Sequence, residues 1–255
     1  MSVQKFLYDS YLREHTSYVE SFHIINNLPA IALAENIFHP SGGGQPRDHG
    51  TVIINKINYK VEDIIKIKGV TNLVLDSSAL VSLDEFYGEE VNSILDWERR
   101  YCLMRYHTGG HILMSAARQT VLGYEPQGME IENDLSSCKI LFTSEEEFTE
   151  ENCSLVLDIA LNAIDGNASI EAKNYPSLDI AKEEHTDKFR INSNLNLKGK
   201  VRIIIIENYD ANPCSGTHVK SLGEVGLLTI ESFSYQSTER IASIKFKMGA
   251  SQFLK

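Results

Sequence analysis

The 255-residue chain has little of what marks several large classes of protein. Its four cysteines are too few and too irregularly spaced for a disulfide scaffold, which favours a reducing compartment. No apolar run approaches the roughly 18 to 20 residues that cross a bilayer. The N-terminus lacks the basic and apolar segments of a signal peptide. The composition therefore predicts a cytoplasmic globular protein without a membrane partner.

Basic side chains are also scarce, since 24 Lys and Arg face 35 Asp and Glu and the net charge is −11. This excess of negative charge argues against diffuse, sequence-independent attraction to nucleic acid. A local basic face remains open, because four arginines cluster in one short stretch: Arg99, Arg100, Arg105 and Arg118. The stretch is consistent with two interpretations, a phosphate-binding face and a solvated helix face with local ion pairs.

Short β-rich segments separated by turn formers fill the first third of the chain. They lie at 31–34, 50–54, 59–61 and 72–75, with a hairpin turn at 55–58. Several short strands at this spacing predict a small barrel. The pattern changes near residue 88. We therefore predict two domains, a β-barrel domain over 1–88 and an α/β domain over 89–255.

Helical and strand-like segments alternate in the rest of the chain. Apolar residues between Trp97 and Leu122 repeat at three and four positions, which predicts a helix capped by Gly123. A second helix is predicted over 149–164. Strands are predicted at 139–142, 169–172, 200–207, 226–232 and 240–248. The predicted fold class is α+β, a small N-terminal β-barrel followed by an α/β two-layer sandwich.

Two histidines, His107 and His111, lie four residues apart inside the first predicted helix. Four residues turn a helix by about 400°, so the two imidazoles project about 40° apart and can bind one cation. The intervening Gly109 and Gly110 each cost a helix roughly 1 kcal/mol relative to Ala, which suggests that something approaches that backbone closely. The alternative interpretation is two ordinary helix histidines beside a packing glycine.

A cysteine and a histidine repeat this spacing a hundred or so residues later, at Cys214 and His218. Pro213 and Gly216 break helical continuity there, so we predict a turn that enters a strand. Imidazole and thiolate are the ligands that zinc selects, and neither pair closes a four-ligand site alone. Together the pairs supply three imidazoles and one sulfur, which predicts one zinc ion per chain. Metallopeptidases of the H-E-x-x-H type carry a glutamate directly after the first histidine, where this chain has Thr108. The chain is therefore not a metallopeptidase of that type.

Three adjacent glycines, Gly42, Gly43 and Gly44, lie in the segment from Phe38 to Gly50. Their entropic cost suggests a role, and their exposed backbone N–H groups suit an anion or a substrate oxygen. The segment is neither a P-loop nor a dinucleotide fingerprint, because it lacks the Gly-Lys-Ser/Thr ending and no helix follows. The alternative is a tight turn between barrel strands.

These segments, in this order, resemble the editing domain of alanyl-tRNA synthetase and its free-standing AlaX-type relatives. The resemblance rests on the glycine segment, on the run from Trp97 to His111, and on Cys-x-Gly-Thr-His-Val at 214–219. It spans roughly residues 35 to 250. The threonyl-tRNA synthetase editing domain shares the metal pairs but not this glycine segment, which favours the alanine branch. The resemblance also implies that Asp210 and Arg240 join the three glycines in binding substrate.

The resemblance implies zinc-dependent hydrolysis, in trans and without ATP, of tRNA(Ala) mischarged with serine or glycine. Such an enzyme must spare alanine, and hydrogen bonds to the serine hydroxyl provide that selectivity. Thr108 and Gln45 are the candidate catalytic residues for this contact. The candidate tRNA-binding residues are Arg99, Arg100 and Arg105. Two alternatives remain, a non-catalytic zinc-containing RNA-binding module and a zinc hydrolase of a small ester or amide.

Overall fold

The computed structural model describes residues 2–186, 188 and 197–250. The chain divides into two compact units, of which unit 1 comprises 1–42 and 46–101 and unit 2 comprises 43–45 and 102–255. The division falls inside helix α1 (Trp97–Thr120). The domains that the sequence predicts, 1–88 and 89–255, stay a prediction. In the described part of the chain, no helix has both the length and the apolar character that crossing a membrane requires.

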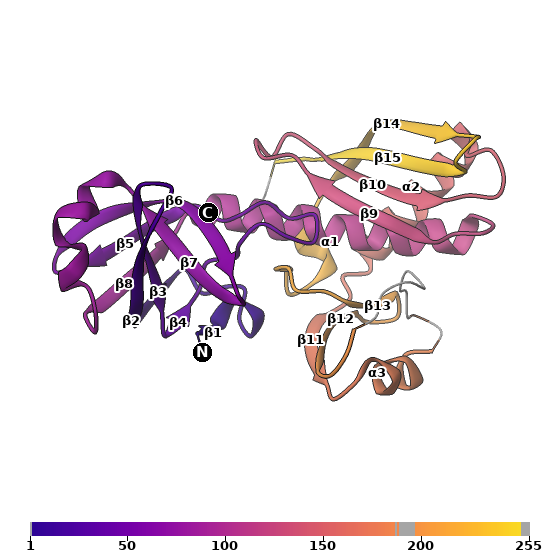
Figure 1. Ribbon diagram of the computed structural model, residues 1–255. Helices are drawn as coiled ribbons and strands as arrows, with labels where there is room; N and C mark the ends of the chain where they lie inside the picture. The colour runs from indigo at the N-terminus through magenta and orange to yellow at the C-terminus, as the bar shows by residue number, and fades with distance from the viewer. Residues whose placement is uncertain (1, 187, 189–196, 251–255) are drawn as a thin grey trace. The chain divides into compact units, whose positions relative to one another are not determined.

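Unit 1 is built on a closed barrel of six strands in the order β2-β3-β7-β6-β5-β8 (Figure 1). Every neighbouring pair is antiparallel, and closure leaves the barrel without a free edge. The strands are β2 (Glu14–Ile25), β3 (Leu28–Leu33), β5 (Gly50–Ile54), β6 (Ile57–Ile67), β7 (Val70–Leu75) and β8 (Glu90–Leu95). The predicted barrel is thus confirmed.

Local sequence explains how this barrel turns and fills. The hairpin between β5 and β6 turns at Asn55 and Lys56, whose φ angles are +51° and +67°. Two consecutive positive φ values give the tight turn whose twist matches that of the flanking strands. Apolar side chains of alternate strand residues fill the interior, among them Ile31, Leu33 and Leu73. Smaller elements complete the unit: β1 (Val3–Gln4), β4 (Glu35–Asn36), and the 3-10 helices η1 (Lys5–Leu7) and η2 (Ser77–Glu85).

A fully buried ion pair lies in unit 1 at the start of α1. Arg100 donates from Nε to Asp48 Oδ1 at 2.9 Å and from Nη2 to the second carboxylate oxygen. The guanidinium also donates to the carbonyl oxygens of Ser10 (2.9 Å) and Ile37 (2.7 Å). Asp48 accepts a further bond from the backbone N–H of His39. Because both charges are shielded from water and each has several partners, the pair is stable only as a unit.

Removing one member of this pair is expected to destabilise unit 1 strongly. Arg100→Met leaves the Asp48 carboxylate buried without its counter-charge, so the free energy of unfolding should fall by about 3–5 kcal/mol. Urea denaturation measures this change. The double variant Arg100→Met/Asp48→Leu should recover a large part of the loss, and a single variant with wild-type stability would contradict the interpretation.

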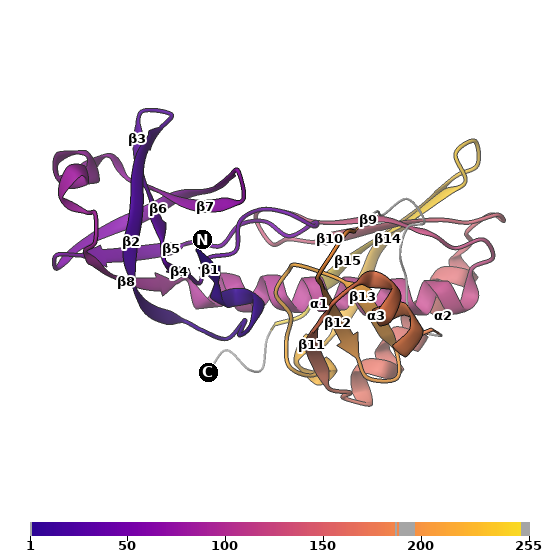
Figure 2. The same ribbon diagram turned by 60° about the horizontal axis from the view of Figure 1, so that its bottom comes forward.

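Unit 2 combines helices with two antiparallel sheets (Figures 1 and 2). One sheet has the order β14-β15-β10-β9 and the other β11-β12-β13. The first comprises β9 (Pro126–Ile131), β10 (Cys138–Thr143), β14 (Leu228–Gln236) and β15 (Ile241–Met248). The second comprises β11 (Ile170–Tyr175), β12 (Val201–Ile206) and β13 (Asp210–Pro213). The helices are α1, α2 (Glu150–Asp165), α3 (Leu178–Glu184) and the 3-10 helix η3 (Leu222–Val225). The predicted α+β fold class is confirmed.

Helix α1 packs against the four-stranded sheet through its two glycines (Figure 2). A Cβ at Gly109 would overlap the Met248 side chain on β15, and a Cβ at Gly110 would overlap Met129 on β9. The predicted close approach to this backbone is therefore confirmed, and what approaches is the sheet. Without the glycines the helix could not lie this near the strands.

The segment at Cys214 differs from the sequence prediction. We predicted a turn that enters a strand, but Cys214 directly follows β13, and the chain then leads to η3. The prediction was wrong because Asp210–Pro213 has a composition that disfavours strands. This segment becomes β13 by pairing with β12, in the register Ile206 to Asp210 and Ile203 to Pro213.

Candidate metal centre

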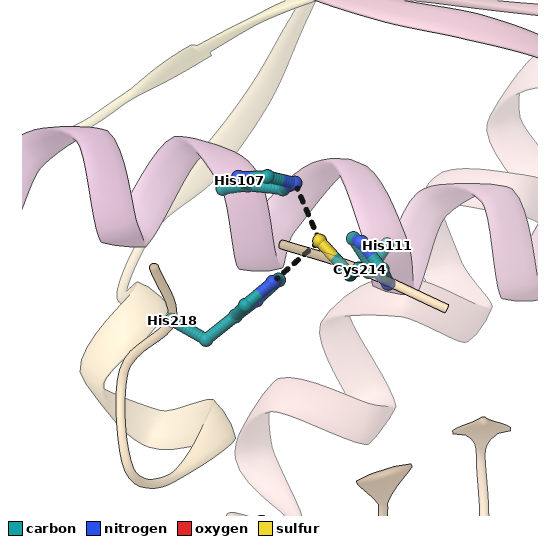
Figure 3. A group of neighbouring side chains, drawn as sticks. All are labelled: His107, His111, Cys214 and His218. Atoms are coloured by element: carbon teal, nitrogen blue, oxygen red, sulfur yellow. Dashed lines mark hydrogen bonds between the residues drawn. The ribbon is translucent and has the colours of Figure 1, made fainter. Parts of the chain in front are cut away.

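Four side chains from α1 and from the loop after β13 converge inside unit 2 (Figure 3). They are His107, His111, Cys214 and His218, and their potential ligand atoms all lie within 4.8 Å of one another. Cys214 Sγ lies 3.4 Å from His107 Nε2 and 3.3 Å from His218 Nε2. The structure thus brings together all four residues that the sequence predicts as metal ligands.

Each imidazole of this cluster is held by a polar side chain at its Nδ1 atom. The pairs are His107 with Gln45 Oε1 (2.7 Å), His111 with Asp210 Oδ2 (3.1 Å) and His218 with Thr108 Oγ1 (3.1 Å). Amide and carboxylate oxygens only accept, so Nδ1 of the first two histidines carries the proton. Nε2 is then the atom through which each ring can bind a metal, which is the arrangement that metal-binding histidines adopt.

The loop that carries Cys214 is clamped from β12. Arg202 Nη1 donates to the carbonyl oxygens of Cys214 (2.7 Å) and Gly216 (3.0 Å). The Gly216 N–H in turn donates to Cys214 Sγ at 3.3 Å. A Cβ at Gly216 would overlap the His107 imidazole, so the loop and helix approach closely only because this residue is glycine. Arg202 was not predicted, although a lone charge in the apolar run of β12 was a visible signal.

Burial and neighbouring charges set the protonation states of the cluster. Burial raises the pKa of the Cys214 thiol, but the His107 and His218 imidazoles outweigh it and hold that pKa well below its usual value. Burial lowers the pKa of His111, yet hydrogen bonds with Asp210 and Cys214 outweigh it and raise the pKa to about 10. Burial and His107 lower the pKa of His218 to about 3. A thiolate and a neutral imidazole are the forms that bind a metal ion, so Cys214 and His218 are already in these forms, whereas a metal ion must displace a proton from His111.

The donor set and its spacing fit zinc. With Zn–N of about 2.0–2.1 Å and Zn–S of about 2.3 Å, tetrahedral angles separate sulfur and nitrogen ligands by about 3.6 Å. The two sulfur–nitrogen distances in the cluster, 3.4 and 3.3 Å, lie near that value. Three imidazoles and a thiolate are also the soft and borderline donors that zinc prefers. The residues present therefore suit the predicted zinc ion.

A cavity of about 470 Å³ opens beside the cluster, and three of the four candidate ligands line it. These are His107, His111 and Cys214, whereas His218 is not among the lining residues. Other parts of the wall come from Gly43, Gly44, Met114, Tyr124, Met129 and Asn212. Among the described residues, none of those that line this cavity carries a carboxylate. A small molecule that enters therefore meets two imidazoles and a sulfur.

The residues predicted to bind substrate occupy different places. Gly43 and Gly44 line the cavity, and Gly42 does not. Asp210 is buried, with its carboxylate engaged by His111 and by the Asn212 amide. Arg240 is exposed in the turn between β14 and β15 and does not line the cavity. Their roles toward substrate stay predictions.

Gln45 and Thr108 are buried and turned toward the histidines. Gln45 Oε1 accepts from the Thr217 N–H (3.0 Å) as well as from His107, and Gln45 Nε2 donates to Thr217 Oγ1 at 2.9 Å. Thr108 Oγ1 contacts His218 Nδ1 and accepts from the Val219 N–H at 3.4 Å. Neither residue lines the cavity. Their contacts place both residues behind the candidate ligands.

The three arginines predicted to bind tRNA are buried and have backbone or carboxylate partners. Arg99 Nε donates to the Arg47 carbonyl at 3.0 Å, and Arg100 forms the ion pair with Asp48 described above. In unit 2, Arg105 donates to the carbonyl oxygens of Val225 and Gly249. These contacts differ from the solvated helix face considered as the alternative. Contact with tRNA stays a prediction for all three.

The fold and the candidate metal centre together define a class of protein. Its members combine a six-stranded barrel with an α/β unit that holds three histidines and a cysteine. Residues 201–245 match the family described as the threonyl and alanyl tRNA synthetase second additional domain. This matched segment includes Cys214 and His218.

Two relatives show the wider similarity. The chain is 32% identical over 241 residues to the alanyl-tRNA editing protein AlaX-L of Pyrococcus horikoshii, covering 94% of this chain and 56% of the relative. It is also 32% identical over 222 residues to the alanine–tRNA ligase of Ignicoccus hospitalis, covering 87% of this chain and 23% of the ligase. The chain thus spans about half of the first protein and a quarter of the second. The resemblance predicted from the motifs is confirmed.

Zinc binding is expected to depend on the cysteine of the cluster. Wild-type protein should retain one zinc ion per chain after gel filtration, and Cys214→Ala should lose it because only three imidazoles remain. Atomic absorption measures the metal content. Cys153→Ala, in helix α2, is the matched control and should keep the full equivalent. A stoichiometric zinc content in Cys214→Ala would show that the cluster is not the site.

The Arg202 clamp is expected to raise zinc affinity without touching the ion. Arg202→Met frees the two carbonyl oxygens of the cysteine loop, and loss of such outer contacts typically weakens metal binding by about 10- to 100-fold. Competition against a chromophoric chelator measures the affinity. Arg202→Lys keeps one donor group and the charge, so its zinc affinity should lie between those of wild type and Arg202→Met. Lys247→Met, at an exposed residue of β15, controls for lost charge, and equal affinities of Arg202→Met and wild type would contradict this role.

Proposed function

We propose that the protein hydrolyses, in trans, the ester that links serine, or glycine, to tRNA(Ala), with one zinc ion per chain. The observation that carries this proposal is the cavity whose wall includes three of the four candidate zinc ligands. The similarity to an alanyl-tRNA editing protein and to alanine–tRNA ligases supports the substrate class. Because the chain spans only part of these relatives, activity and partner are our proposal for this chain.

The proposed reaction needs placement of an ester and one water molecule. The water oxygen bonds to the ester carbonyl carbon, the bond from that carbon to the ribose oxygen breaks, and a proton passes to the ribose oxygen. Free amino acid and uncharged tRNA result. When bound, zinc supplies a Lewis acid that polarises oxygen ligands and stabilises developing negative charge. The chain's part is to position the ester against this centre.

The residues of the chain account for holding and orienting the centre. Gln45, Asp210 and Thr108 fix the three imidazole rings, and Arg202 fixes the loop that carries the thiolate. The backbone of Gly43 and Gly44 lines the cavity without side chains, which leaves room for the aminoacyl group. A cavity of about 470 Å³ is large enough for an amino acid ester and the end of a nucleotide chain.

The cavity also bears on the two alternatives. A structural zinc module normally closes its ligand shell within the protein, whereas here three candidate ligands face an open cavity. That observation favours an enzyme over a non-catalytic RNA-binding module. A hydrolase of a small ester or amide fits the same cavity, and the requirement for tRNA separates it from the editing enzyme.

The proposed function is expected to appear as selective deacylation. Without ATP, wild-type protein should release serine from Ser-tRNA(Ala) and leave Ala-tRNA(Ala) intact, and a chelator or His107→Ala should abolish the release. Filter assays of labelled aminoacyl-tRNA measure the rates, with Ser-tRNA(Ala) alone as the blank. Binding without release would support the RNA-binding module. Cleavage of a seryl methyl ester as fast as of Ser-tRNA(Ala) would support the small-ester hydrolase.

A further inference from the structure

Within the part of the chain that the structure describes, two residues on the cavity wall carry polar atoms that have no hydrogen-bond partner. They are the Tyr124 hydroxyl and the Asn212 side-chain oxygen, and both atoms are buried. Both residues line the cavity beside His107, His111 and Cys214. A buried polar atom left without a partner destabilises a folded protein, so such atoms call for an explanation. Two of them on one cavity wall indicate that a ligand supplies the missing bonds.

Both atoms lie near Asp210, the residue that holds His111. The Asn212 amide nitrogen donates to the two Asp210 oxygens, at 2.7 and 2.8 Å, and this fixes which end of the amide is the free acceptor. Burial raises the pKa of Tyr124 and the nearby Asp210 charge raises it further, so the phenol stays protonated. The unpaired atoms are therefore a neutral hydroxyl and an amide oxygen beside the candidate ligand His111.

The chemistry of these atoms defines the group that would complement them. The amide oxygen only accepts, whereas the phenol both donates and accepts. A hydroxyl group satisfies both, because it can donate to Asn212 and accept from Tyr124, whereas an ammonium group can only donate. Met114 and Met129 line the same cavity, and their unbranched side chains can shift to admit an atom at this position.

We propose that Tyr124 and Asn212 are specificity-determining residues that bind the side-chain hydroxyl of a seryl ester. This inference rests on the proposed function and deepens it. Alanine lacks the hydroxyl and would leave both buried atoms unpaired, which is how a polar site rejects a smaller analogue. Gln45 and Thr108, the candidates from sequence, already direct their polar atoms to the histidines and to backbone or side-chain atoms at 217 and 219.

Tyr124→Phe tests the proposal, because it removes only the hydroxyl. A hydroxyl that holds the fold together would lower the melting temperature when lost, whereas an unpaired one should leave it unchanged or raise it. The variant should bind a non-hydrolysable seryl-adenosine amide about 10- to 100-fold more weakly than wild type and an alanyl-adenosine amide equally well. Calorimetry measures both affinities. On tRNA, Tyr124→Phe should slow serine release from Ser-tRNA(Ala) relative to glycine release from Gly-tRNA(Ala).

Tyr235→Phe is the matched control, because that hydroxyl has a partner, the Ser144 carbonyl at 3.3 Å, and the residue does not line the cavity. It should keep the wild-type preference for the seryl over the alanyl amide. The proposal is overturned if Tyr124→Phe keeps this preference, or if it weakens both amides equally.

The binding readout also separates this proposal from the proposed function. A wild type that prefers the seryl amide but releases no serine from tRNA would overturn the editing function and leave the hydroxyl site standing. A wild type that releases serine while Tyr124→Phe retains the full preference would overturn the hydroxyl site alone.

Discussion

The contact of the Cys214 sulfur with imidazoles of helix α1 and of its own loop is the constraint on which the organisation of unit 2 depends. Several polar donors gathered away from water are stable only if each finds partners, because burial penalises every one of them. The partners come from distant parts of the chain. Gln45 reaches Thr217 across 172 residues of sequence, so residues 43–45, helix α1 and the cysteine loop are held together at one point.

Glycines allow these segments to approach closely. Gly216 lies against the His107 ring, and Gly110 lies against the Met129 side chain, at distances that no Cβ would permit. Gly44, whose φ of +81° suits glycine, approaches the Met129 backbone, and its carbonyl accepts from the Ile131 N–H at 2.9 Å. Met129 thus lies between the glycine segment and α1. Of the glycines that seemed costly in sequence, Gly43 and Gly44 line the cavity, whereas Gly109 and Gly110 let α1 approach the sheet.

The sequence was most informative where structure is set locally. The apolar stripe of α1, the start of α2 at Thr149 and the four-residue spacing of both ligand pairs depend on neighbours along the chain, and all appear as predicted. Strand β13 and the positions of the arginines depend on partners distant in sequence. A pattern reveals the charge of Arg105 but not the Val225 carbonyl that binds it. The sequence pattern does not single out Tyr124 and Asn212, because an unpaired atom is a property of the folded chain.

The cavity also bears on how four protein ligands could serve the proposed hydrolytic centre. Four donors saturate a tetrahedral zinc ion, and a saturated ion is normally structural. Here His218 is 5% exposed, does not line the cavity, and is held at Nδ1 by Thr108, while its Nε2 lies 3.3 Å from the Cys214 sulfur. Displacing it would break contacts on both ring nitrogens. An arriving group meets His107, His111 and Cys214 first, so the arrangement favours approach at that face with His218 kept in place.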